Sequence, residues 1–141
     1  HAIWLAGLGY QVDAIDRDAA VMSGMIGIEN INIRVTDIEA SDAPLLKAQY
    51  DGIIVSRYLY RPLLKTLADA LKPGGVLIYE TFMTGNERYG KPSNPDFLLR
   101  PDELLEVYSP LLKIIAFAQG DESEPRPAVM QRICAVKHID A

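Results

Sequence analysis

The chain has few of the features that mark secreted, membrane-embedded or nucleic-acid-binding proteins. It contains one cysteine and two histidines in 141 residues, which excludes an internal disulfide and leaves too few ligands for a Cys/His metal site. No apolar run approaches the roughly 18 residues of a membrane span. Lysine and arginine number 14 against 19 acidic residues, a formal net charge of −5. We therefore expect a cytoplasmic protein with no metal site and no nucleic-acid or membrane partner.

What is present is typical of a globular protein that buries a core. Hydrophobic residues make up 49% of the chain and charged residues 23%, and the length suits one domain over residues 1–141. A helical apolar pattern is already under way from Ile3 and stops at Gly9. An α/β domain normally has a strand and a glycine-rich turn before such a helix. We therefore expect a single domain that lacks its first strand and is truncated at its N-terminus.

Residues 50–82 form the most informative stretch, because they predict a strand, a helix, a turn and a second strand. The apolar runs 53–55 and 76–79 suit parallel strands that are covered on both faces. Between them, Pro62 suits the first turn of a helix, and leucines and alanines recur at helical spacing up to Leu71. The sequence Pro-Gly-Gly at 73–75 then ends the helix. This is a βαβ unit.

The remaining elements complete an α/β pattern. Strands are expected at 11–16 and 31–36, and helices at 18–28 and from Pro101 to Tyr108. The segment 83–101 is rich in Gly, Asn, Pro and Ser and is interpreted as a long loop or lid. Two β-type runs, 112–118 and 128–136, are separated by a polar turn and predict an antiparallel hairpin at the edge of the sheet.

Polar residues stand where the predicted parallel strands end, and ligands of open α/β sheets bind at that edge. These residues are Asp16, Asp37, Ser56 with Arg57, and Glu80. A carboxylate accepts hydrogen bonds only, so Asp16 can take both hydroxyl protons of a ribose and Asp37 can accept from an adenine amino group. The alternative is that each aspartate merely caps the following turn or helix.

Several segments together resemble the class I S-adenosylmethionine-dependent methyltransferases, in particular the small bacterial enzymes related to the tellurite-resistance group. The segments are VDAID, RVTDIE, YDGIIVSRYLY, LKPGGVLIYETF and the final hairpin. The resemblance implies a Rossmann-like three-layer sandwich with a mostly parallel sheet and a C-terminal antiparallel hairpin. It also implies S-adenosyl-L-methionine as cofactor. The family's first strand and glycine-rich loop should precede His1 and are absent.

By this resemblance the cofactor-binding residues would be Asp16, Arg17, Asp37, Ile38, Ser56 and Arg57. Asp16 would hold the ribose, Asp37 and the Ile38 backbone would meet the adenine, and Ser56 and Arg57 would line the methionine side. The acceptor would be a small molecule, and a homodimer is allowed.

The acceptor-binding candidates are Glu80, Arg88, Tyr89 and Lys91, at the end of the fifth family strand and on the predicted lid. An ordinary solvated loop explains the last three nearly as well. Methyl transfer depends mainly on positioning, so no catalytic residue is assigned. If a general base is needed, Glu80 and Tyr89 are candidates by position.

Two other functions stay open. A non-catalytic adenosyl-binding or scaffold domain would keep the fold without turnover. An NAD-dependent oxidoreductase is less favoured, because an acid after the second strand also recognises the ribose of NAD but the terminal antiparallel hairpin argues against it.

Overall fold

The computed structural model describes residues 12–16, 31–35, 50–124 and 126–139. The chain divides into two compact units, His1–Pro44 and Leu45–Ala141. Each unit is described by itself below. Among the described residues, no helix is both long enough and apolar enough to cross a bilayer.

In the first unit, strand β1 (Val12–Asp16) pairs in parallel with β2 (Ile31–Val35). Each strand agrees with the predicted one to within a residue. Asp16 is the last residue of β1 and pairs with Val35, so the two strands end at one edge of this sheet. The predicted helix at 18–28, the opening helix and the candidates Arg17, Asp37 and Ile38 lie outside the described residues.

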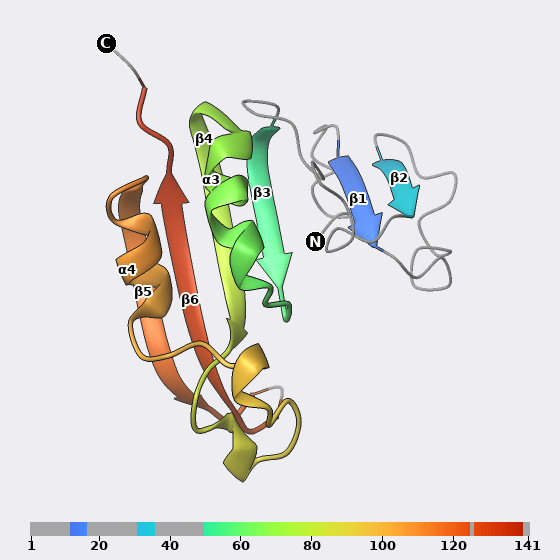
Figure 1. Ribbon diagram of the computed structural model, residues 1–141, viewed down its shortest axis with the longest axis vertical. Coiled ribbons are helices and arrows are strands. Elements are labelled where there is room, and N and C mark those ends of the chain that lie inside the picture. The colour runs from blue at the N-terminus through green and yellow to red at the C-terminus, as the bar shows by residue number, and fades with distance from the viewer. Residues whose placement is uncertain (1–11, 17–30, 36–49, 125, 140–141) are drawn as a thin grey trace. The chain divides into compact units, whose positions relative to one another are not determined.

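The second unit is built on a four-stranded sheet with the order β3-β4-β6-β5 (Figure 1). Its strands are β3 (Tyr50–Ser56), β4 (Leu71–Phe82), β5 (Lys113–Glu122) and β6 (Ala128–Val136). Only β3 and β4 pair in parallel, whereas β6 pairs antiparallel with both β4 and β5. The predicted hairpin is therefore confirmed, with β5 at the sheet's edge, although β5 runs to Glu122, four residues beyond its predicted end. The described part of this sheet is mixed rather than mostly parallel.

Two α-helices cover one face of this sheet (Figure 1). A single 3₁₀ turn, η3 (Arg61–Leu63), leads into α3 (Leu64–Ala70), which confirms the predicted helix to within a residue or two. Helix α4 (Glu103–Tyr108) begins two residues later than expected, because Asp102 has a left-handed backbone with φ of 62°. The helices are joined where the Tyr108 hydroxyl donates to the Leu64 carbonyl at 2.8 Å.

The Pro-Gly-Gly sequence makes the return from α3 to β4 as an irregular start of the strand. The ladder pairs Tyr50 with Leu71 and next Gly52 with Val76, so the residues between Leu71 and Val76 bulge out. Gly74 adopts φ of +82°, which favours glycine. A Cβ on Gly75 would lie 2.8 Å from the Lys72 carbonyl oxygen. Both glycines are therefore required by the turn.

The core lies between the helices and the sheet. Its buried side chains include Leu67, Leu77, Tyr79, Leu104 and Tyr108. The helix residues recur at helical spacing, as the sequence predicted. The prediction that the run 76–79 is covered on both faces was wrong, because burial alternates along β4 and Ile78 is 44% exposed.

A buried carboxylate stabilises the first turn of α4. The side chain of Glu103 is 2% exposed and forms a bidentate pair with Arg61, at 2.7 and 2.9 Å. Burial by itself raises the pKa of Glu103. The hydrogen bonds from Arg61 and from the Arg100 backbone, with the charges of both arginines, more than offset burial and hold this pKa below its ordinary value.

Candidate functional site

The sheet of the second unit has two chemically different faces. Because side chains alternate along a strand, Tyr79 and Thr81 point to the helices while Glu80 and Phe82 point to the opposite face. The burial of β4 follows this alternation, with Tyr79 and Thr81 buried and Glu80 and Phe82 only partly so. The opposite face therefore carries the polar residues at the carboxyl end of β4.

A cleft of about 440 Å³ lies on this opposite face. Strand residues Glu80, Phe82, Met130 and Arg132 line it, together with residues of the loops at 86–91 and 124–127. The cleft thus opens where the parallel strands β3 and β4 end, which is the edge that open α/β sheets use for ligands.

A chain of hydrogen bonds crosses all four strands beside the cleft. Ser56 Oγ donates to Glu80 at 3.0 Å, and Arg132 Nε donates to the other oxygen of Glu80 at 2.9 Å. The same guanidinium then donates to Glu122 at 2.8 Å. One arginine therefore bridges two carboxylates, and both oxygens of Glu80 already accept hydrogen bonds.

The loop from Met83 to Leu99 is ordered by buried contacts rather than being open coil. Asn86 is 2% exposed; its amide donates to the Pro92 carbonyl and its oxygen accepts from the Val129 backbone. Two 3₁₀ turns, η4 (Asn86–Arg88) and η5 (Pro95–Phe97), and a bridge between Met83 and Leu99 complete the loop. The predicted lid is thus fixed at its base and exposed at its tip.

Exposed residues fasten the tip of this loop to β5. Arg88 and the Tyr89 hydroxyl both donate to Asp121 Oδ1 at 2.9 Å, and the Arg88 guanidinium lies 5.3 Å from the Tyr89 ring centroid. The hydrogen bond to Asp121 raises the pKa of Tyr89 above its ordinary value. Tyr89 lines the cleft as a neutral phenol, and Arg88 supports it from outside.

Four cations and three anions line the cleft. The cations are Arg57, Lys91, Arg126 and Arg132. The anions are Glu80, Glu122 and Glu124. Within the described part of the chain, the side chains of Arg57, Lys91, Arg126 and Glu124 are exposed and make no hydrogen bond or ion pair.

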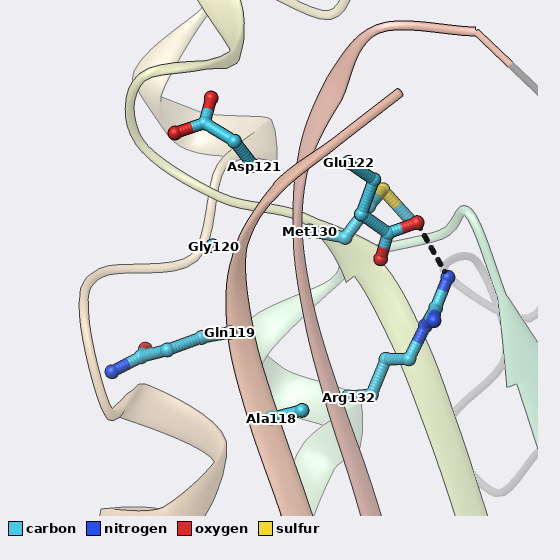
Figure 2. Close-up of a pocket in the computed structure, with 7 residues that line it drawn as sticks. All are labelled: Ala118, Gln119, Gly120, Asp121, Glu122, Met130 and Arg132. Carbon is cyan, nitrogen blue, oxygen red and sulfur yellow. Dashed lines mark hydrogen bonds and ion pairs between the residues drawn. The ribbon is translucent and has the colours of Figure 1, made fainter. Parts of the chain in front are cut away.

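A second hollow, of about 160 Å³, lies against the β5–β6 hairpin (Figure 2). Figure 2 shows Glu122 and Arg132 joined on one side of the hairpin, while Gln119 and Asp121 point to the other side. Glu122, Met130 and Arg132 line both hollows, so this one adjoins the larger cleft. The larger cleft holds most of the charged groups and is the stronger candidate site.

The structure gathers several of the candidates that the sequence suggested. Arg57, Glu80, Tyr89 and Lys91 line one cleft. Ser56 contacts Glu80, and Arg88 lies outside the cleft lining. Asp16 ends β1 as predicted. Their roles in binding stay predictions.

Sequence reasoning missed Arg132, which organises the polar face of the sheet. One signal was available, because Arg132 is the only charged residue in the strand 128–136. It also missed Arg61 and Asp121, whose partners lie 42 and 32 to 33 positions away in the chain. No metal-binding cluster occurs among the described residues.

Comparison with known proteins gives the fold family. No protein-family model and no curated protein matches the chain. An S-adenosylmethionine-dependent methyltransferase from Methanosarcina mazei is similar in structure, with a TM-score of 0.69 at 15% identity over 98% of this chain and 87% of that one. TehB from Haemophilus influenzae gives a TM-score of 0.74 at 18% identity, over 96% of this chain and 53% of that one.

A third similar structure is the N-methyltransferase NodS from Bradyrhizobium japonicum WM9 in complex with S-adenosyl-L-homocysteine. Its TM-score is 0.64 at 16% identity, over 90% of this chain and 66% of that one. The chain therefore has a Rossmann-like α/β fold of the class I methyltransferase type, which confirms the fold family that the sequence resembled. The chain spans about half the length of the TehB structure.

Proposed function

We propose that the chain serves S-adenosylmethionine-dependent methyl transfer to a small-molecule acceptor. The observation that supports this most is the cleft at the carboxyl end of β3 and β4, in a fold of the methyltransferase type. Its volume of about 440 Å³ falls within the range of small-molecule sites, roughly 300–1,000 Å³. We keep the single domain of residues 1–141 as part of this proposal.

The cofactor would be held by the strand-end residues. Asp16, Arg17, Asp37 and Ile38 would serve the adenosine portion, and Ser56 and Arg57 the methionine portion. Arg57 fits that role on its own geometry: its backbone N–H is bonded to the Glu80 carbonyl at 2.9 Å, while its guanidinium is exposed and unpaired within the described part of the chain. A free guanidinium suits an amino-acid carboxylate.

The bound cofactor supplies an electrophilic methyl group, so the chain's own residues mainly position the acceptor. Tyr89 and Lys91 line the cleft from the loop at 86–91, and Glu80 lines it from the sheet. Glu80 is held by Ser56 and Arg132, and Tyr89 is held by Asp121. These partners fix the direction of both side chains, which is what orientation of an acceptor requires.

Calorimetric titration of the full-length protein with S-adenosylhomocysteine tests the proposal. We expect saturable binding that Asp16→Ala weakens about 10- to 150-fold, the scale of a lost hydrogen bond to a charged group at about 1.5–3 kcal/mol. Asp51→Ala is the matched control, because Asp51 lies near the amino end of β3 and is 78% exposed. Absence of binding, or equal effects of both variants, would overturn the proposal.

The same protein separates the two alternative functions. Binding of S-adenosylhomocysteine without transfer to any acceptor in a broad screen would support a non-catalytic adenosyl-binding domain. Tighter binding of NADH than of S-adenosylhomocysteine would support an oxidoreductase. The antiparallel β5–β6 hairpin speaks against the oxidoreductase, as it did in the sequence.

A further inference from the structure

The side chains that line the cleft carry a net positive charge, whereas the chain as a whole is negatively charged. Four cations and three anions line it, which leaves a formal charge of +1 (4 − 3) in a chain whose net charge is −5. The cleft is therefore a basic spot on an acidic protein.

Among the described residues, ion pairs in the cleft involve both Glu80 and Glu122 but only one of the four cations, so the other three cations carry its unpaired positive charge. Arg132 is shared by Glu80 and Glu122, so these three groups satisfy one another. The remaining cations, Arg57, Lys91 and Arg126, have no hydrogen bond or ion pair within the described part of the chain. Arg57 is assigned to the cofactor above, which leaves the charges of Lys91 and Arg126 without an assigned partner.

Lys91 and Arg126 approach the cleft from two different loops. Lys91 follows η4, in the loop that Asn86 anchors, and Arg126 lies in the turn between β5 and β6. Asn86 also ties these two segments together, since its side-chain oxygen accepts from the Val129 backbone at the start of β6. Because both side chains also line one cleft, these two exposed cations can bind one anionic group there.

We propose that Lys91 and Arg126 recognise an acidic group, a carboxylate or a phosphate, on the methyl acceptor. The acceptor is thus a small organic anion. Glu124, which has no partner among the described residues, lines the same cleft and opposes the anion, so it lowers affinity for acidic molecules in general. That this anion belongs to the acceptor rests on the proposed function, whereas the anion site itself does not.

A titration followed by NMR tests the site without any need for turnover. The probes are benzoate and phenyl phosphate, with benzamide as the neutral control, at low ionic strength because exposed charges are screened by salt. We expect saturable shifts at Lys91 and Arg126 with the two anions and none with benzamide. Absence of such shifts would overturn the proposal.

Charge-matched variants distinguish a specific anion-binding site from nonspecific attraction by the protein's overall charge. We expect Lys91→Gln and Arg126→Gln each to weaken anion binding about 3- to 10-fold, somewhat more than an isolated exposed pair. Glu124→Gln should strengthen it about 1.5- to 5-fold. Lys65→Gln makes the same change in net charge on the exposed side of α3 and should have no effect. A loss as large with Lys65→Gln would show nonspecific attraction and overturn the proposal.

Competition with S-adenosylhomocysteine shows whether the bound acidic group belongs to the acceptor or to the cofactor. If the probe still binds when the protein is saturated with S-adenosylhomocysteine, the site belongs to the acceptor, as proposed. If S-adenosylhomocysteine displaces the probe, the site holds the cofactor's own carboxylate and the acceptor assignment falls. If S-adenosylhomocysteine does not bind at all while the probe does, the proposed function fails and the anion site stands.

Discussion

Two glutamate–arginine clusters lie on opposite faces of the same sheet and have opposite surroundings. Glu103 is 2% exposed and pairs, on the helix-covered side, with Arg61, which is 35% exposed. Glu80 is 27% exposed and pairs with Arg132, itself 48% exposed, beside the cleft. A buried pair is strongly destabilised when one partner is removed, whereas an exposed pair contributes little to stability. The same chemistry therefore serves folding on one face and is free to serve binding on the other.

Removal of each carboxylate gives the sharpest test of this contrast. Glu103→Ala removes the carboxylate acceptor of Arg61 and of the Arg100 backbone N–H, while Arg61 keeps its bonds to the Asp96 and Leu98 carbonyls. We expect a loss of about 2–4 kcal/mol in the free energy of unfolding. Glu80→Ala should cost less than about 1 kcal/mol. Urea unfolding followed by circular dichroism measures both, and equal losses would remove the distinction between the two faces.

Two neighbouring residues of β6, Gln131 and Arg132, allow the same comparison of the two faces, with a smaller expected difference in the free energy of unfolding. Gln131 is fully buried, accepts from the Leu104 backbone and donates to the Arg100 carbonyl. Gln131→Leu should therefore cost about 1–3 kcal/mol, because buried backbone groups lose their partners. Arg132→Met, one position along and on the cleft face, should cost less than about 1 kcal/mol. The free energies of unfolding would contradict the assignment of faces if this order were reversed.

Acid should weaken the helix-covered face through Glu103. The folded-state pKa of Glu103 lies below its ordinary value of 4.5, so its pair stabilises the protein above that pH. This stabilisation is lost as the pH falls through the folded-state pKa, since the unfolded chain binds the proton more tightly. Unfolding free energies measured over a pH series should fall more steeply in the wild type than in Glu103→Gln. Parallel curves would show that the buried pair has no such linkage.

The smallest effect is expected at the exposed tip of the loop. The hydrogen bond to Asp121 raises the pKa of Tyr89, so Asp121→Asn should bring this pKa down toward its ordinary value. Ultraviolet absorbance of the phenolate follows the titration, with Tyr89→Phe identifying the signal among the seven tyrosines. An unchanged Tyr89 titration in Asp121→Asn would show that the loop is not fastened to β5 in solution.

Elements with a continuous local pattern were predicted well from the sequence. The helix after Pro62, the strand 128–136 and the hairpin all depend on residues close together in the chain, whose spacing and turn chemistry are visible directly. The start of α4 was predicted less well, because the left-handed backbone of Asp102 is held by a distant side chain: Gln119 accepts from its N–H and donates to its carboxylate.

The residues of the candidate site also fall into two groups, those that local sequence pattern predicts and those that only long-range contacts bring to the cleft. Arg57, directly after β3, and Glu80, two residues before the end of β4, follow from local pattern, and both line the cleft. Arg126 and Glu124 come from a polar turn that looked like an ordinary connection, and only the hairpin's return brings them to the cleft. The local pattern gave no role to Arg61, because its partner Glu103 lies 42 positions later in the chain.

The sequence by itself determined the α/β pattern, the βαβ unit with its glycine turn and the polar residues at strand ends, because each depends on side-chain periodicity or on backbone limits within a few residues. Tertiary structure alone decided which carboxylate is buried, which cations stay unpaired and which loops share a cleft. These outcomes depend on contacts between residues tens of positions apart, where burial and partner choice, rather than residue type, set the energy of a charge.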